Sequence, residues 1–178
     1  MKKIKQYEKW FYGIAIVILL GLFYSSSMTY KQQTSVPFLE RYLQNKPFEH
    51  SLSQIGFNYG GKYQSVANDG YFKFIEFFIR KGAHFSIYLV LGVFLALALI
   101  TYFKRNYFLM IVIPWMTTTG LAAFDEFHQG LTGGRTPLVE DVILDSAGAF
   151  TGIVILVICL YLFSIRNKKY DSQIARTS

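Results

Sequence analysis

Four long apolar runs limit what this chain can fold into. They cover Trp10–Tyr24, Ala83–Phe103, Tyr107–Phe124 and Val142–Phe163 of the 178 residues. A membrane-spanning helix needs roughly 17–25 mostly apolar residues, and the last three runs meet that length. The first run is short, but Ser25–Met28 can extend it without a charge. The runs predict an all-α, polytopic membrane protein with four transmembrane helices; a soluble bundle of buried helices is the alternative.

The basic residues predict how the spans are oriented. Ten of the 18 Lys and Arg residues lie in the N-terminal segment, in the Lys104-Arg105 turn or after Phe163, where only Glu8 and Asp171 are acidic. The opposite side would hold the remaining eight basic and nine acidic residues. Because cytoplasmic flanks carry the Lys/Arg excess, both termini are expected in the cytoplasm.

The net charge of +7 is therefore explained by the basic residues that orient the spans in the membrane. The basic residues flank spans and form no single patch, so no nucleic-acid partner is expected. Basic flanks attract anionic lipid head groups, which makes membrane lipids the expected partners.

We expect one membrane domain over residues 1–178. Its parts are spans at 10–27, 83–103, 107–124 and 142–163, a long extracytoplasmic connection over 28–80, and a polar cytoplasmic tail over 164–178 that is disordered from Arg166. The single cysteine, Cys159, lies in the fourth span and cannot form an intrachain disulfide. A buried structural thiol is the expectation for it.

The first span has a second interpretation, as a secretory signal peptide. Four lysines within the first nine residues precede an apolar core and three serines, which is the general pattern of such a peptide. The segment Ser25–Met28 matches a small-x-small cleavage site poorly. An uncleaved anchor is therefore favoured.

The connection contains local structure signals. Ser35-Val36-Pro37 is a typical helix start. Gly60-Gly61 lies between two short aromatic segments and predicts a hairpin, because glycine allows the positive φ of a tight turn. From Phe74 to Lys81 the apolar residues follow a helical period, which predicts an interfacial helix that continues into the second span. The region either caps the bundle or has a function of its own.

Ionisable side chains crowd the predicted outer ends of the second, third and fourth spans. The cluster consists of Lys81 and His84, then Asp125-Glu126-Phe127-His128-Gln129, then Gly133-Gly134-Arg135, and finally Asp141 and Asp145. Charge at membrane depth costs about 2.5–3.5 kcal/mol per residue on insertion scales, so such groups are functional candidates. The cluster is the predicted site.

Helical spacing arranges part of this cluster. Lys81 and His84 share a face with Tyr88, and His84 also follows Glu76 and Arg80 at four-residue intervals. In the third span, the spacing puts three residues on one face and turns one acid roughly 100° away. Those on the shared face are Asp125, His128 and Gln129; the acid turned away is Glu126.

The start of the fourth span combines capping and packing signals. Thr136 is expected to cap the helix and Pro137 to suit its first turn, while Glu140 and Asp141 complement the positive end of the helix dipole. Asp141, Asp145, Gly148 and Gly152 form one stripe. The glycine end of this stripe lets another helix pack closely.

Structural roles compete with functional ones for several of these residues. Arg80 and Lys81 could anchor a helix end at the lipid head groups. Asp145 could pair with Lys81 or Arg135 to hold spans together. His84 suits a structural or a functional role equally, because imidazole serves both.

The residue types are compatible with several chemistries. Lys81 and Arg135, with the amides at the start of the fourth span, can bind an anion such as phosphate, and Gln129 and Asp145 are further candidate binding residues. General acid–base groups could come from Glu126, Asp125, Asp141 and His84. A divalent metal held by Asp125, His128, Asp141 and Asp145 is an alternative that no spacing requires. The cofactor, if any, is unknown.

Two resemblances follow from these residues. The chain resembles the VanZ-like family over about residues 74–163. The matching pieces are Arg80-Lys81-Gly82-Ala83-His84-Phe85, Tyr88, Gly92, Asp125-Glu126-Phe127-His128-Gln129, Gly134-Arg135, Asp141, Gly148 and Gly152. The spacing Arg135-x5-Asp141-x3-Asp145 is also similar to an element of lipid phosphate phosphatases. There, however, a nucleophilic histidine stands where this chain has Asp141, and their Pro-Ser-Gly-His element is missing here.

The VanZ-like family is named after a teicoplanin-resistance protein of Gram-positive bacteria. The resemblance implies a plasma-membrane protein of the cell envelope that lowers susceptibility to lipoglycopeptide antibiotics. Many relatives carry Asn at the position of Asp145. This departure either argues against a strict role for Asp145 or gives this chain an additional carboxylate. The resemblance supplies no catalytic mechanism.

Three functional hypotheses follow. The first is a membrane-embedded protein that processes a lipid-linked or cell-wall anionic precursor at the outer face. The second is a non-catalytic binder that masks such a precursor or the lipid tail of a lipoglycopeptide; the aromatic segment Tyr71–Phe78 beside the site motivates it. The third is a small ion or proton carrier, although the acids gather at one end of the spans.

Overall fold

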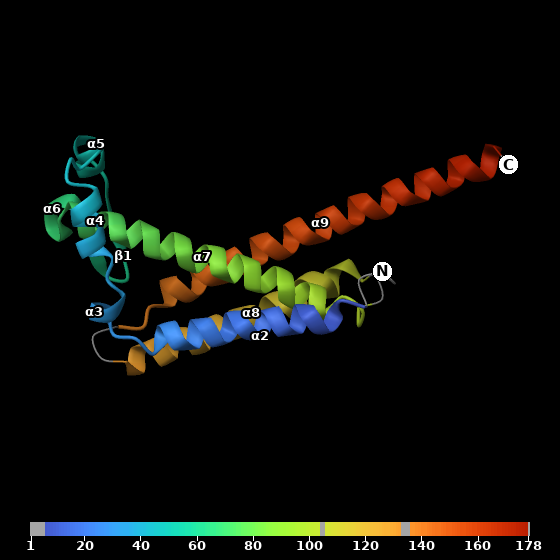
Figure 1. Cartoon of the computed structure of the whole chain (residues 1–178), viewed down its shortest axis with the longest axis horizontal. Helices are drawn as coiled ribbons and strands as arrows, with labels where there is room; N and C mark the ends of the chain where they lie inside the picture. Colours follow the sequence, from blue (N-terminus) through green and yellow to red (C-terminus); the bar gives the residue numbers. More distant parts are fainter. Residues whose placement is uncertain (1–5, 104–105, 133–135, 178) are drawn as a thin grey trace.

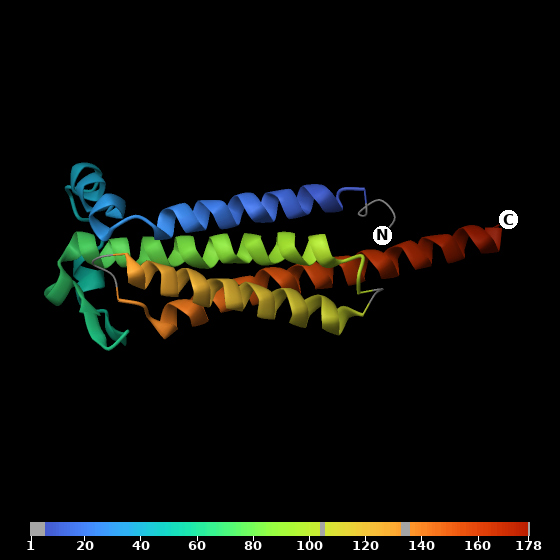
Figure 2. The same ribbon diagram turned by 90° about the horizontal axis from the view of Figure 1, so that it is seen from below.

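Four long helices form the body of the molecule. The computed structural model describes residues 6–103, 106–132 and 136–177, with side chains as far as Arg166. The helices are α2 (Glu8–Ser26), α7 (Tyr71–Leu99), α8 (Tyr107–Leu131) and α9 (Val139–Thr177), which run roughly along one axis (Figures 1 and 2). All four are long and apolar enough to cross a membrane. The predicted all-α fold with four candidate spans is confirmed.

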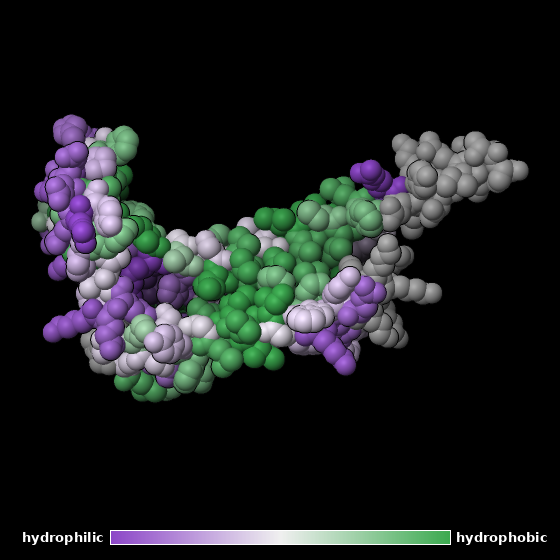
Figure 3. Space-filling model, viewed as in Figure 1, coloured by the Kyte–Doolittle hydropathy of each residue, from purple (hydrophilic) through white to green (hydrophobic). Residues whose placement is uncertain are grey.

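The outer surface of the bundle is apolar. Large side chains such as Val17 on α2, Met116 on α8 and Phe163 on α9 are each at least 64% exposed. Figure 3 shows this apolar surface along the helices, with polar surface towards both ends. A soluble bundle would bury such side chains, whereas lipid solvates them. The chain is a multi-pass membrane protein.

Glycines bring α7 and α9 into close contact. A Cβ at Gly148 would overlap the Phe85 carbonyl oxygen, and one at Gly152 would lie 2.5 Å from the Leu89 carbonyl oxygen. On the facing helix, a Cβ at Gly92 would lie 2.9 Å from the Ala149 carbonyl oxygen. The predicted close packing along the glycine stripe is confirmed, and its partner is α7.

The segment between α2 and α7 folds over one end of the bundle, and we call residues 30–69 the cap. It consists of α3 (Tyr30–Gln33), α4 (Val36–Tyr42), α5 (Glu49–Ser53), the strands β1 (Gly56–Tyr59) and β2 (Lys62–Ser65), and α6 (Val66–Asp69). The strands pair antiparallel with Tyr59 opposite Lys62. Gly60 and Gly61 have φ of 56° and 72°, as the predicted turn requires. The predicted hairpin and the helix after Ser35 are confirmed.

Helix α2 is an integral part of the bundle. Its Ala15 and Leu22 belong to a buried cluster with Tyr88 and Leu91 of α7 and Ala122 of α8. At its end, Ser26 Oγ lies 2.8 Å from His128 Nδ1. These contacts favour the interpretation of this segment as a retained anchor.

Three expectations about the fourth span were wrong. Helix α9 begins at Val139, so Thr136 and Pro137 lie before it, and the Glu126 carboxylate accepts the Leu138 N–H in place of the predicted threonine cap. The helix continues through Thr177, where disorder was predicted from Arg166. Cys159 is exposed because it lies on the outward face of α9. Helical propensity extends the last helix beyond the apolar run, which composition alone does not reveal.

Candidate functional site

A polar cavity of about 570 Å³ lies where the cap meets the ends of α7, α8 and α9. Its charged lining residues come from the hairpin, from α6 and from the three long helices. They are Lys62, Asp69, Lys73, Glu76, Arg80, Lys81, Glu126 and Asp141. The cavity therefore combines four cations with four carboxylates close to the ends of membrane-spanning helices.

Lys81, Asp141 and Tyr59 form the closest polar cluster in this cavity. The Lys81 ammonium and the Tyr59 hydroxyl both donate to Asp141 Oδ1. The Lys81 Nζ also lies 4.9 Å from the centre of the Tyr59 ring and 5.5 Å from that of Phe77, within cation–π range. This cluster ties α7, α9 and the hairpin together.

Tyr59 stays a neutral donor in this cluster. Burial raises the pKa of its phenol above the ordinary value, and the hydrogen bond to Asp141 raises it further. A raised phenol pKa keeps the proton on Tyr59 at physiological pH. Tyr59 can therefore offer a hydrogen bond to Asp141, or to a ligand that replaces it.

Glu126 holds the start of α9. Its Oε1 accepts the Leu138 N–H at 2.7 Å, and the residue is 7% exposed. A carboxylate next to the unpaired amides of a helix N-terminus is stabilised by the helix dipole. Glu126 is therefore placed between α8 and the first turn of α9, where it also lines the cavity.

Asp125 and Gln129 pair one helical turn apart. The Gln129 amide donates to Asp125 Oδ2 at 2.9 Å, and both side chains are buried. Gln129 lines the polar cavity, whereas Asp125 faces α2. The pair therefore lies between the polar cavity and the side of α8 that faces α2.

His84 and Asp145 form a deeper pair between α7 and α9. His84 Nδ1 lies 3.3 Å from Asp145 Oδ2, and Asp145 is 3% exposed. Its Oδ1 makes no hydrogen bond with the described residues. A structural pairing of Asp145 with Lys81 is not found, because Lys81 donates to Asp141 one turn earlier on α9. The alternative partner, Arg135, lies outside the described residues.

His128 is turned away from the acidic residues. It stacks on Phe23 of α2 with ring centres 4.5 Å apart, and its Nδ1 meets Ser26. The four-residue metal set with Asp125, Asp141 and Asp145 is therefore wrong. Within the described part of the chain, no group of three or more His, Cys, Asp or Glu side chains could hold a metal ion.

Most of the predicted site residues come together. Lys81, Glu126, Gln129 and Asp141 line the polar cavity. Asp125 joins it through Gln129, while His84 and Asp145 pair next to it without lining it. Arg135 lies outside the described residues.

Sequence reasoning missed the contributions of the cap and of the lead-in to α7. Tyr59 reaches Asp141 across 82 positions of the chain, and Glu76 accepts hydrogen bonds from the start of the cap. No periodic pattern connects such distant residues. The only sequence signal for Tyr59 is its place directly before the Gly60-Gly61 turn, at the end of a predicted hairpin.

The comparisons with known proteins bear on the whole arrangement. Neither a curated protein nor a solved structure matches this chain. A family model described as VanZ/LLP1 matches residues 10–161. This match includes most of α2 and the whole cap, which lie outside the region 74–163 that carried the resemblance. It covers most of the 178 residues, and the chain therefore belongs to the VanZ/LLP1 family.

Proposed function

We propose that this protein binds and processes a lipid-linked, anionic precursor of the cell envelope at the outer face of the plasma membrane, and thereby lowers susceptibility to lipoglycopeptides such as teicoplanin. The polar cavity carries this proposal, because it gathers four cations, three on α7 and one on the hairpin, together with four carboxylates close to the ends of membrane helices. An anionic group attached to a lipid reaches such a position without leaving the membrane. The excess of basic residues on the flanks assigned to the cytoplasm supports the outer face for the cavity.

Lys81 is the first residue that we assign to the anion. Its ammonium now donates to Asp141, and its side chain is 23% exposed to the cavity. An anionic substrate would compete with Asp141 for this ammonium. The displaced Asp141 carboxylate, still beside the Tyr59 hydroxyl, would then be available to accept a proton. Arg135 is the second proposed anion ligand.

Glu126 is the second candidate for proton transfer. Its Oε1 is bound to the Leu138 N–H, and the residue lines the cavity near Lys81 and Asp141. His84, held by Asp145, and Asp125, held by Gln129, complete the set of acid–base groups around this point. Each group is positioned by a neighbour, as preorganised sites require.

Variants of Glu126 and Lys81 test the proposal. In a deletion strain complemented with Glu126→Gln, we expect conversion of the envelope precursor to fall about 10²–10⁴-fold, the usual contribution of a general acid–base group. Lys81→Met should weaken the same conversion, because the cavity loses the cation that donates to Asp141. The measurement is a lipid and wall-precursor profile of the membranes, alongside teicoplanin susceptibility.

Matched controls separate chemistry from folding. Glu140→Gln changes an exposed acid in the same region, and Lys31→Met removes an exposed cation from the cap. Both should behave like the wild type at equal membrane abundance. A normal precursor profile in both Glu126→Gln and Lys81→Met would contradict the proposal.

A non-catalytic binder is the second candidate, and one observation favours it. The carboxylates around the cavity already accept hydrogen bonds: Asp141 from Lys81 and Tyr59, Glu126 from Leu138. A binder that only masks a precursor, or the lipid tail of a lipoglycopeptide, needs no uncommitted base. It predicts stoichiometric protection that Glu126→Gln leaves intact, and turnover of purified precursor would exclude it.

A further inference from the structure

The polar cavity presents its positive charges more openly than its negative ones. In both of its ion pairs the side chain of the cation is more exposed than that of the acid: 66% against 9% for Lys62 and Asp69, and 23% against 16% for Lys81 and Asp141. The other two carboxylates of the cavity, Glu76 and Glu126, are buried. A ligand that enters the cavity therefore meets cations first.

Two of these cations have no acidic partner. Lys62 and Lys81 each pair with an aspartate, whereas Lys73 and Arg80 form no ion pair with any of the described carboxylates. Lys73 is exposed, Arg80 is half-buried, and both line the cavity. The cavity therefore holds two positive charges that a ligand can neutralise.

The acids nearest in sequence are committed elsewhere. Glu76 lies three residues after Lys73 and four before Arg80, the spacings at which opposite charges pair on a helix. Its carboxylate instead accepts hydrogen bonds from the start of the cap. Asp69, four residues before Lys73, is paired with Lys62. The attachment of the cap thus leaves both cations available.

Arg80 is held in place without using its donors. Its Cζ lies 5.3 Å from the centre of the Tyr30 ring, within cation–π range. This contact restricts the guanidinium and leaves its N–H groups for a ligand. Arginine suits the bidentate recognition of a phosphate group better than lysine does.

The spacing of the two cations favours an anion with two charged groups. Lys73 and Arg80 are seven residues apart on α7, so they share a face and lie about 10 Å apart along the helix axis. A phosphate diester carries one charge at one point and could neutralise only one of them. A diphosphate carries charge on each of two linked phosphates, and the long side chains of the cations can cover the remaining distance.

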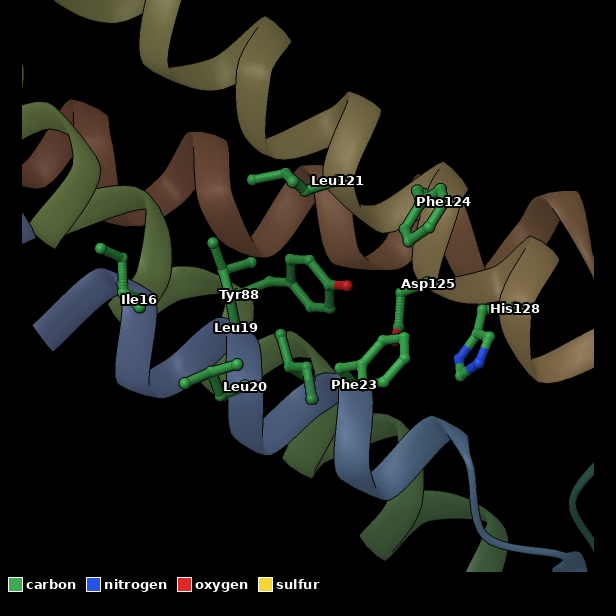
Figure 4. A pocket seen from close by; sticks show the side chains of 10 residues that line it. Ile16, Leu19, Leu20, Phe23, Tyr88, Leu121, Phe124, Asp125 and His128 are labelled. Atoms are coloured by element: carbon green, nitrogen blue, oxygen red, sulfur yellow. The ribbon is translucent and has the colours of Figure 1, made fainter. Parts of the chain in front are cut away.

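Two other cavities of the bundle lack such cations. The cavity between α2 and α8, drawn in Figure 4, and the one between α8 and α9 have no Lys or Arg among their described lining residues. Anion binding is therefore expected in the polar cavity.

We propose that the polar cavity binds a diphosphate group, with one phosphate on Arg80 and the other on Lys73. The phosphate on Arg80 is the nearer one to Lys81 along α7, so it is the one that would compete with Asp141 for the Lys81 ammonium. This inference rests on the proposed function and specifies the anionic group of its substrate. A diphosphate can belong to a membrane lipid or to a soluble ester, and the test separates the two.

Isothermal titration with paired ligands tests the diphosphate. The full-length protein in phosphatidylcholine nanodiscs is titrated with farnesyl diphosphate and with farnesyl monophosphate, with empty nanodiscs as the reference. We expect the diphosphate to bind at least about tenfold more tightly, a difference of about 1.4 kcal/mol. Inorganic pyrophosphate is the third ligand: binding as tight as that of farnesyl diphosphate would assign the group to a soluble ester, and weaker binding would assign it to a lipid.

Variants of the two cations should remove the preference. Arg80→Gln and Lys73→Gln should each weaken farnesyl diphosphate about tenfold, because each loses a charge-assisted hydrogen bond. Arg80→Lys keeps the charge and should retain most of the preference, which separates lost binding from misfolding. Equal binding of the two farnesyl phosphates by the wild type, or a preference that survives both Gln variants, would overturn the proposal.

The cap provides matched controls. Arg41 is an exposed arginine that also lies over a tyrosine ring, with its Cζ 6.0 Å from the centre, but it does not line the cavity. Lys31 is an exposed lysine that does not line it either. Arg41→Gln and Lys31→Gln should bind both farnesyl phosphates as the wild type does. An equal loss in these controls would also contradict the assignment, because it would reflect net charge alone.

The precursor profile separates this inference from the proposed function. A diphosphate preference together with normal profiles in Glu126→Gln and Lys81→Met would refute the proposed processing alone. Altered profiles in those variants without a diphosphate preference would refute the diphosphate alone.

Discussion

Glu76 shows how one carboxylate attaches the cap to the bundle. It is 2% exposed on α7 and accepts hydrogen bonds from the Tyr30 hydroxyl at 2.7 Å, the Thr34 hydroxyl at 2.9 Å and the Ser35 N–H. Burial raises the pKa of the Tyr30 phenol, and the hydrogen bond to Glu76 raises it further, so Tyr30 remains a donor. A buried carboxylate is tolerated because several donors surround it.

Replacing Glu76 should loosen the start of the cap. Glu76→Gln substitutes an amide whose nitrogen cannot accept a hydrogen bond, so at least one cap donor loses its acceptor. We expect a destabilisation of about 1–3 kcal/mol, the cost of an unsatisfied buried group. Limited proteolysis within residues 28–70 should accelerate, and thermal unfolding in detergent should begin at a lower temperature.

Glu40→Gln is the matched control, because Glu40 is an exposed acid in the cap. Equal proteolysis rates for the two variants would show that Glu76 does not hold the cap.

Among the helices, the contact between α7 and α9 positions the candidate site. The glycine stripe lets the two backbones approach, and the pairs Lys81–Asp141 and His84–Asp145 lie one turn apart along the same contact. Small residues allow such close packing in membranes, where van der Waals contact replaces the hydrophobic effect between helices. A change in the stripe should therefore affect both stability and site geometry.

Gly148→Ala should separate these two helices. The added Cβ would overlap the Phe85 carbonyl oxygen, and a backbone atom cannot move aside as a side chain can. We expect a loss of about 1–3 kcal/mol, as for overpacked cores. Thermal unfolding of the purified protein measures this loss.

Gly120→Ala on α8 provides the comparison, since a Cβ there meets no described atom within 4 Å. It should leave the protein unchanged or slightly more stable, because alanine favours helix over glycine. Equal destabilisation by both variants would contradict a specific role for the stripe.

For the whole molecule, the charge distribution predicts that the cap and the polar cavity lie outside the cytoplasm. Labelling of single cysteines in a Cys159→Ser background tests this topology. Ser53→Cys in α5 should react with a membrane-impermeant maleimide in intact cells, and Asn106→Cys, before α8, only after permeabilisation. Both positions are exposed, so the membrane alone should decide the difference. The reverse pattern would invert the assignment and put the cavity in the cytoplasm.

Sequence patterns were sufficient for features that depend on neighbours in the chain. The apolar runs predicted four spans, Gly60-Gly61 predicted the hairpin turn, and the helical stripe of Gly148 and Gly152 predicted a close helix contact. They failed at the start of α9, because the predicted cap at Thr136 is replaced by Glu126, twelve positions before Leu138. Local propensity cannot report a cap that another helix supplies.

The sequence by itself determined the fold class, the family and the set of ionisable residues at one end of the spans, since hydropathy, turn chemistry and motifs act locally. Only the tertiary structure decided which of these residues meet. It joined Asp141 to Lys81 and Tyr59, it turned His128 towards α2, and it paired Asp125 with Gln129 at the wall of the polar cavity. These outcomes depend on how α2, α7, α8, α9 and the cap pack together. Contacts between segments far apart in the chain leave no periodic trace in the sequence.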